Sequence, residues 1–345
     1  MPKVLTMVGY SASDVGIIFA AGPMVRFLLP FAFINGLKLN HKSFNIALVI
    51  MVISTLSFYY SLNDFYPLLI SSIGLGIGLS LILPYIEVIS LGCVGKGRYG
   101  KIRLFGSLGF ILVALVLVKF LSSADVALNY LLTLSLFTSV VAFFIVKNQN
   151  IKDGKKSDVQ NDVTLLKDWR LWLGLTLMQI SFGAFYNFFT IYETDFGVSM
   201  DMTIYLWSFG VVVEVFMLFF QGRFLHKNLL TILQITTFAS AIRWFLLFLF
   251  PQNLIILFFA QSLHALSFAL FHSAAISYLF HLYKHKSLAQ QFFSGITYGL
   301  GGFVGALSAG YIYELYPKYL FLSATFIALM ACKSLYNFSK TSNNQ

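Results

Sequence analysis

Two ionisable side chains lie at the facing ends of neighbouring apolar runs, where a charge is costly. Glu87 ends one run and Arg103 begins the next, with the basic segment Lys96–Arg103 leading into it. An ionised group deep in a membrane costs about 2.5–3.5 kcal/mol on insertion scales, so it is expected to face a partner or water. The guanidinium of Arg103 suits a carboxylate, either that of Glu87 or that of a substrate between them. The alternative for Arg103 is an interfacial arginine whose head reaches the membrane surface.

A second set of residues has the chemistry to move protons, because histidine titrates near neutral pH. Arg243 lies inside one apolar run, and the next run carries Gln261, His264, Phe268 and His272 at spacings of three, four and four. These spacings place the four side chains on one helical face. We predict that His264 and His272 relay protons. The alternative is that each polar side chain only hydrogen-bonds one membrane helix to another.

Tyr186 and Asn187 are predicted to line a pocket, whereas Gln179 suits a hydrogen bond between helices. The sequence contains no Walker loop, nucleophile elbow or metal-ligand spacing, and its two cysteines have no pairing context. We therefore expect no cofactor, no metal and no enzymatic activity. A membrane enzyme built on the histidines and Glu87 is a weak alternative.

The composition requires a membrane protein. The 345 residues are 58% hydrophobic and 10% charged, whereas soluble domains carry roughly 25% charged residues. The net charge of +10 resides in short loops between apolar runs, which excludes nucleic acid as a partner. We expect the bilayer, protons and a small molecule to be the partners, and the chain to be a monomer.

Eleven apolar runs are long enough to cross about 30 Å of hydrocarbon as helices. They fall at 14–35, 43–61, 66–90, 103–121, 126–146, 169–191, 203–224, 229–250, 253–280, 288–313 and 318–337. The longest polar break separates five runs from six. The sequence thus predicts an all-α membrane protein with a lobe at 1–147, a linker at 148–168 and a lobe at 169–345. Glycine pairs, Gly74 with Gly78 and Gly301 with Gly305, mark close helix approaches.

Lysine and arginine alternate between the two sides of the predicted spans. Eighteen lie in one set of loops and only Lys3, Lys119 and Lys318 in the other. The rich set is cytoplasmic by the positive-inside rule, which places the linker and the C-terminus inside. We predict a multi-pass protein of the bacterial inner membrane.

An internal repeat relates the two halves. Residues 9–26 align with residues 197–214 without a gap, and two glycines and one serine coincide: Gly9 with Gly197, Gly22 with Gly210, and Ser11 with Ser199. The first span is then equivalent to the second span of the C-terminal lobe, so we expect the N-terminal lobe to lack one helix of six. We expect the chain to be truncated or its start codon to be placed late. The repeat pairs Arg26 with Glu214, which predicts a contact between them, direct or through substrate. The alternative is that each pairs within its own lobe.

Several motifs resemble the major facilitator superfamily, and within it the branch of phenylpropionate and oligosaccharide:proton symporters. They are YGKIRLFGSLGF at 99–110, PYIE ending at Glu87, YLWSFGVVVEV around Glu214, AIRW with Arg243, and SLH ending at His264. The resemblance covers almost the whole chain. It implies the major facilitator fold of twelve helices in two lobes, here with 11 transmembrane helices (5 + 6).

The resemblance also implies roles for particular residues. Glu87 and Arg103 match a substrate-binding pair, and Arg243 and His264 match residues tied to proton coupling. The sequence departs from the pattern in three places. Ser267 replaces the proton-titrating carboxylate, Phe110 replaces the tryptophan that stacks on sugar, and the loop 35–42 lacks the usual Gly, Asp and Arg pattern.

Because of these departures, we expect Glu214 first, and Glu87 second, to be the proton-binding carboxylate. They also make a galactoside a weaker candidate for the substrate. We therefore predict a proton-coupled symporter of a small organic solute, an aromatic or other organic acid such as phenylpropionate, working by alternating access. Arg26, Glu87, Arg103, Phe110 and Tyr186 are the expected substrate residues. The alternatives are a sugar or nucleoside symporter, and a non-transporting sensor or truncated remnant.

Overall fold

The computed structural model describes residues 2–34, 37, 40–94, 96–120, 123–147, 163, 165–284 and 286–342. Side chains are described in these ranges except at 33, 34, 84, 87, 88, 90–94, 96–104, 118, 287 and 342. Every regular element in the described ranges is a helix. The all-α fold class predicted from the sequence is therefore confirmed.

Long helical stretches lie at each predicted span. The single helices are α2 (Ala12–Ile34), α3 (His41–Ser61), α4 (Phe65–Val94), α5 (Lys96–Phe120), α6 (Ala124–Lys147), α7 (Trp169–Asp195), α8 (Met200–Phe220), α10 (Leu229–Leu249) and α15 (Leu320–Ser342). Two stretches contain π-helical turns: α11 (Leu254–Ser262), η1 (Ala265–Leu270) and α12 (Phe271–Leu282), then α13 (Lys286–Phe292), η2 (Phe293–Leu300) and α14 (Gly301–Leu315). Short elements are α1 (Pro2–Val8), which was not predicted, α9 (Gly222–Leu225) and η3 (Pro317–Tyr319).

The length and hydropathy of the helices identify this bundle as a multi-pass membrane protein. Nine helical stretches within the described residues are long and apolar enough to cross a bilayer. In α5 the apolar part is shorter, Phe105–Leu117, and α7 is not among the nine. The predicted count of eleven spans, and the division into two lobes joined by a linker at 148–168, stay predictions.

The internal repeat has a structural counterpart at the start of two helices. Gly9 and Gly197, which coincide in the repeat, both have positive φ angles, of 109° and 97°, a conformation that glycine adopts without strain. α2 and α8 then begin three residues later in each copy. At α8 the side chain of Ser199 caps the helix by accepting from the N–H of Met202. A glycine at the same place in the repeat therefore precedes the helix in both halves.

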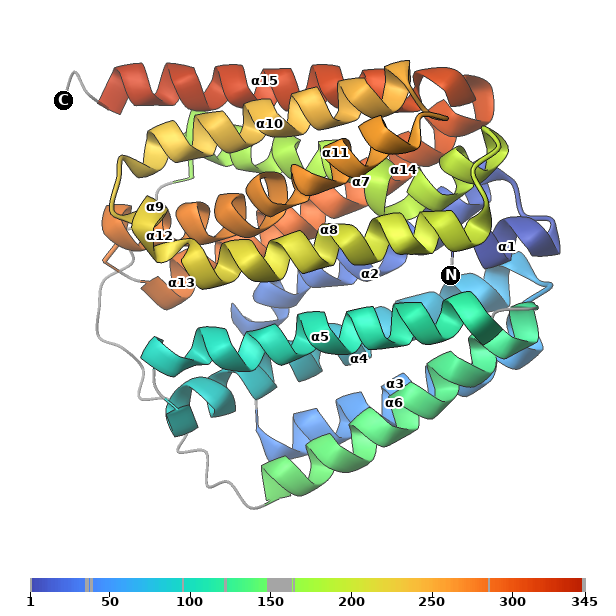
Figure 1. The fold of residues 1–345 in the computed structure, drawn as a ribbon. Coiled ribbons are helices and arrows are strands. Elements are labelled where there is room, and N and C mark those ends of the chain that lie inside the picture. The colour runs from blue at the N-terminus through green and yellow to red at the C-terminus, as the bar shows by residue number, and fades with distance from the viewer. Residues whose placement is uncertain are drawn as a thin grey trace.

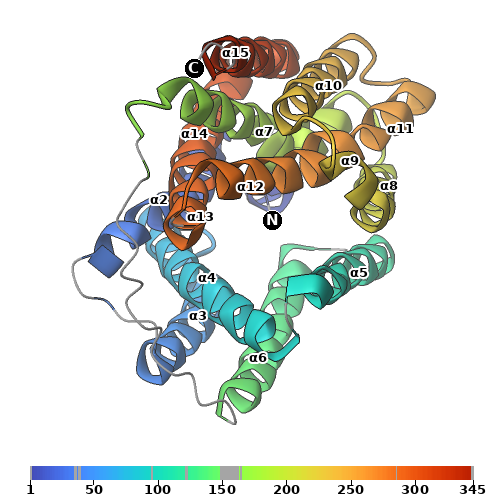
Figure 2. The ribbon, with the colours of Figure 1, turned by 90° about the vertical axis from the view of Figure 1, so that its left-hand side faces the viewer.

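The helices run side by side across Figure 1, with α7 to α15 in the upper part and α3 to α6 in the lower part. α2 packs against α4 on one side and against α14 and η2 on the other, and α5 packs against α8. Figure 2 shows this arrangement along the helix axes. We call the end where α6 finishes and α7 begins the linker end. The opposite end, where α7 finishes and α1 lies, is the distal end.

Glycines bring the backbones of neighbouring helices together. A Cβ placed on Gly78 would lie 2.9 Å from the Cβ of Met51, so α4 sits directly on α3 at that point. A Cβ on Gly16 would lie 2.9 Å from the Cα of Gly310, which joins α2 to α14 near the distal end. Small residues at such crossings permit the dense packing on which membrane helices depend.

Candidate functional site

Arg243 is at the centre of a buried polar cluster. It lies in the second half of α10 and is 0% exposed. Its Nη2 donates to Oε1 of Gln261 at 2.7 Å, and its Nη1 lies 2.9 Å from Nδ1 of His264 and 3.3 Å from Oγ of Ser267. A buried guanidinium is tolerated only where such partners take up its donors.

Glu214 extends this cluster from α10 and η1 to α8. Its Oε2 lies 3.5 Å from Nε2 of His264, and both side chains are nearly buried. Because Arg243 can only donate to Nδ1, the proton of a neutral His264 ring is on Nε2, directed at the carboxylate. The hydroxyl of Ser107, on α5, reaches Oε1 of Glu214 at 3.5 Å. Guanidinium, imidazole and carboxylate thus form one line across three helices.

A π-helical turn helps to assemble the cluster. α11 ends at Ser262, and η1 starts immediately after His264. A π-helical turn changes the angular spacing of side chains and is frequent at functional sites. Here Gln261, His264 and Ser267 all reach Arg243, although a regular helix would rotate the last of them away.

The helical face predicted to carry Gln261, His264, Phe268 and His272 divides into two parts. Phe268 stacks on His264, with ring centroids 5.1 Å apart and an interplanar angle of 4°. His272 does not take part in the contacts to Arg243 described above. Its Nδ1 lies 2.7 Å from the hydroxyl of Tyr298, on η2, and its ring is beside Phe293. The role of His272 in proton coupling stays a prediction, and the geometry supports it less than that of His264.

Aromatic rings cover the guanidinium of Arg243. Its Cζ lies 4.1 Å from the ring centroid of Phe185 and 4.7 Å from that of Trp244, distances at which cations interact with aromatic faces. Trp207, on α8, packs against Phe185 with centroids 4.2 Å apart. Tyr186 stacks over Trp207, with ring centroids 6.5 Å apart. The cluster therefore has charged donors at its base and an aromatic wall beside them.

The predicted substrate residues are distributed around this wall. Tyr186 is 39% exposed and Phe110 is 46% exposed. The ring centroid of Phe110 lies 6.4 Å from that of Trp207. Arg26 is half-buried on α2. The predicted contact of Arg26 with Glu214 stays a prediction.

Two predicted residues have side chains that lie outside the described set. They are Glu87, on α4, and Arg103, on α5. Their pairing, and their part in substrate binding, stay predictions.

Sequence reasoning missed three contributors to the site, Phe185, Trp207 and Ser107. Trp207 precedes Glu214 by seven residues, so the two share a face of α8, and this spacing was the signal available for it. Ser107 belongs to the motif at 99–110, but nothing in its type or spacing singled it out. Among the described residues no group of three or more His, Cys, Asp or Glu is arranged to hold a metal ion.

Residues 1–323 match the model of the MFS_1 like family. A probable 3-phenylpropionic acid transporter of Escherichia coli (strain K12) is 24% identical over 337 residues, which cover 94% of this chain and 88% of that protein. The uncharacterized transporter YwbF of Bacillus subtilis (strain 168) is 25% identical over 343 residues, which cover 92% of this chain and 83% of that protein.

Solved structures share the fold. The crystal structure of the nucleoside transporter NupG has a TM-score of 0.78 at 14% identity, covering 98% of this chain and 93% of that one. The crystal structure of a D-xylose-proton symporter has a TM-score of 0.71 at 14% identity, covering 98% and 91%. At these identities the likeness concerns the fold alone.

Proposed function

Since the chain belongs to the MFS_1 like family, and is thus a multi-pass transporter of the major facilitator superfamily, we propose that it is a proton-coupled symporter. Its proposed substrate is a small organic acid of the phenylpropionate class. The observation that carries this proposal is the buried line of Arg243, His264 and Glu214. In the proposed cycle, protonation of Glu214 removes the charge beside His264. The histidine is then free to turn, and Arg243 is released toward substrate.

The donors of the cluster favour an anion. Nε of Arg243 and Nε2 of Gln261 are buried and have no hydrogen-bond partner among the described residues. Unmade buried donors are costly, so a ligand that accepts from them gains their full interaction. A carboxylate next to a guanidinium forms the stronger, charge-assisted type of hydrogen bond. A neutral sugar or nucleoside offers no such charge, so it remains the second candidate.

The aromatic wall supports an aromatic acid within that class. Phe185 lies over the guanidinium, and Tyr186 and Trp207 continue the wall from Phe185. Rings of this kind stack on a flat apolar group. A probable phenylpropionic acid transporter among the relatives agrees with this chemistry. We propose that the carboxylate binds at Arg243 and the phenyl ring against the wall.

The basic loops support an orientation in the bacterial inner membrane. Lys147, Arg170, Arg223 and Lys227 all lie in segments near the linker end, and an excess of such residues marks the cytoplasmic side. We propose that the linker end and the C-terminus face the cytoplasm and the distal end faces outside. The protein is proposed to act as a monomer.

Glu214→Gln is expected to abolish accumulation of 3-phenylpropionate while leaving exchange of internal for external substrate. Glutamine keeps the shape of the side chain but cannot carry a proton between the two sides. With one proton per substrate, a pH difference of two units drives accumulation to a concentration ratio of about 100, because each unit corresponds to about 1.4 kcal/mol. Protein-free liposomes report passive entry of the protonated acid, and the initial rate of pH-driven uptake by the variant should fall to theirs. The measurement is radiolabelled uptake and counterflow in reconstituted proteoliposomes.

The matched control is Glu314→Gln, which changes an exposed glutamate at the distal end of α14. Glu314 Oε2 accepts from the N–H of Ser13 at 2.7 Å, and a glutamine oxygen can accept in the same way. This variant should accumulate substrate as the native chain does. Undiminished accumulation by Glu214→Gln would show that Glu214 is not the proton site.

A further inference from the structure

Glu193, near the distal end of α7, is a second buried acid, and the cycle described above does not use it. Its side chain is 0% exposed, and neither carboxyl oxygen has a hydrogen-bond partner among the described residues. An ionised carboxylate buried without a partner is strongly disfavoured, whereas the protonated acid carries no net charge. The burial of Glu193 therefore favours its protonated form in this conformation.

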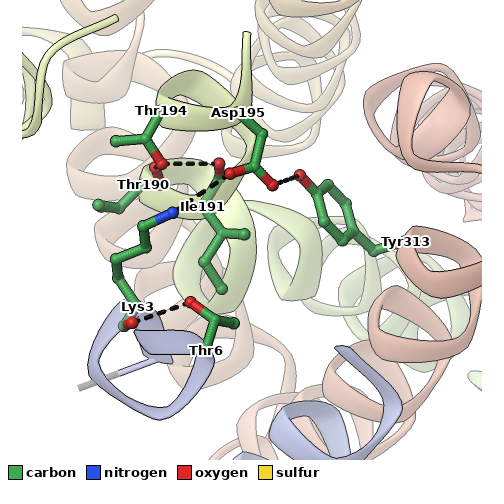
Figure 3. Close-up of polar contacts among 7 residues, drawn as sticks. All are labelled: Lys3, Thr6, Thr190, Ile191, Thr194, Asp195 and Tyr313. Carbon is green, nitrogen blue, oxygen red and sulfur yellow. Dashed lines mark hydrogen bonds and ion pairs between the residues drawn. The ribbon is translucent and has the colours of Figure 1, made fainter. Parts of the chain in front are cut away.

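The groups around Glu193 supply no compensating charge. Tyr192, on the same helix, and Tyr313, on α14, are close enough to interact with it, and both are neutral phenols. The nearby cation, Lys3 of α1, instead pairs with Asp195 at 3.2 Å. Figure 3 shows Lys3 and Tyr313 reaching Asp195 from two different helices, and the Tyr313 hydroxyl donates to it at 2.7 Å.

One further cation lies at this end of the helices packed on α7, the exposed Lys318 of η3. The other charged groups there are acids. Asp14, on α2, accepts from the hydroxyl of Ser11, and Glu314, on α14, accepts from the N–H of Ser13. Asp201, in the first turn of α8, is exposed. An acid cannot offset the charge of another carboxylate, so these groups do not favour ionisation of Glu193.

Contact between the two halves of the chain closes the distal end over Glu193. Leu5 of α1 and Val15 of α2 are buried in the same apolar cluster as Tyr192 and Tyr313. The Lys3 to Asp195 ion pair joins α1 to α7, and the Ser13 to Glu314 bond joins α2 to α14. Separation of α1 and α2 from α7 and α14 would bring water to this end of α7. A carboxyl in water is ionised at neutral pH.

We propose that Glu193 is a proton-binding site that links protonation to closure of the distal end. It holds a proton when α1 and α2 are closed on α7 and α14, and it releases the proton to water when they part. By linkage, a proton that binds one conformation better shifts the equilibrium toward that conformation. This inference rests on the proposed symport and deepens it, because the outer end then closes only after a proton has entered from outside.

The test measures closure of the distal end directly and needs no substrate. Spin labels are placed at Tyr60→Cys, at the distal end of α3, and at Tyr316→Cys, just after α14, positions that are 90% and 63% exposed. The native Cys93 and Cys332 are replaced by serine. Double electron–electron resonance between the labels then gives the populations of closed and open molecules from pH 5.5 to 8.5.

All measurements are made in a Glu214→Gln background, so that titration of Glu214 makes no contribution. With Glu193 present, the ratio of closed to open molecules should rise by up to about tenfold for each unit of falling pH, the slope of one linked proton. With Glu193→Gln, which is neutral at every pH, the ratio should stay high and independent of pH. The control replaces Glu193→Gln by Glu314→Gln in the same background. It should leave the dependence of the closed-to-open ratio on pH unchanged.

Two results would overturn the inference. One is a ratio that does not change with pH although Glu193 is present, and the other is an unchanged slope after Glu193→Gln. Either can occur while Glu214→Gln still abolishes accumulation, in which case the proposed symport stands without this site. Retained accumulation in Glu214→Gln would instead contradict the proposed proton site and leave the slope assigned to Glu193 intact.

Discussion

Arg243→Met is expected to reduce uptake to about one hundredth of the native rate or less. Methionine fills a similar volume but donates no hydrogen bond, so Oε1 of Gln261 and Nδ1 of His264 lose their buried partner. Each unmade bond costs about 1–3 kcal/mol, and about 2.7 kcal/mol in a rate-limiting step corresponds to 100-fold. The measurement is uptake of radiolabelled 3-phenylpropionate per amount of protein in the membrane.

Two further variants separate the role of the charge from that of the fold. Arg243→Lys keeps a positive charge but replaces the planar fork by a single ammonium, and it should remain strongly impaired. Arg223→Met removes an exposed arginine of α9 and should transport normally. The purified Arg243 variants should elute as single species on size-exclusion chromatography. Native uptake by Arg243→Met would remove this arginine from the site.

Gly183→Val is expected to abolish folded protein. A Cβ on Gly183 would overlap the carbonyl carbon and oxygen of Gly305, so α7 could not approach α14 as it does. The obstacle is backbone and cannot move aside without separating the two helices. Overpacking of a tight core typically costs 1–3 kcal/mol even where side chains can adjust, and here the loss should exceed that range. The measurement is the yield of monodisperse protein on fluorescence-detected chromatography.

The matched control for this prediction is Gly109→Val. Gly109 lies in α5, and nothing stands within 4 Å of its Cβ position. Both substitutions place the same β-branched residue in a helix, so their difference reports the contact with Gly305 alone. Equal yields of the two variants would contradict the close crossing of α7 and α14.

The order of the helices followed from the sequence because membrane spans are specified locally. An apolar run of sufficient length must satisfy its backbone hydrogen bonds internally, and only a helix does so within one segment. The repeat of 9–26 in 197–214 also anticipated that α2 and α8 begin in the same way. α1 was not predicted, since its seven residues, Pro2–Val8, are too few to give a periodic signal.

The site was predicted where one helical face carried the information. Gln261 and His264 share a face, and both contact Arg243 as part of one cluster. Spacing along a helix says which residues point the same way, but it does not identify the opposite helix. For that reason the contact of His272 with Tyr298 was not foreseen.

The isolation of Glu193 was not foreseen for a similar reason. In the sequence it stands one residue away from a threonine and two from Asp195, as in any polar helix end. Only the three-dimensional packing of α1, α2 and α14 around α7 shows that Asp195 takes the lysine and that Glu193 is left without a partner among the described residues.

The most direct test of proton symport is the external pH of lightly buffered, de-energised cells that express the chain, recorded as 3-phenylpropionate is added. We expect an alkaline shift larger than that of cells without the chain and of cells with Glu214→Gln, both of which report passive entry of the protonated acid. A disaccharide and a nucleoside, added in turn, should give no shift. Uptake of labelled 3-phenylpropionate without any alkaline shift beyond these controls would contradict proton coupling.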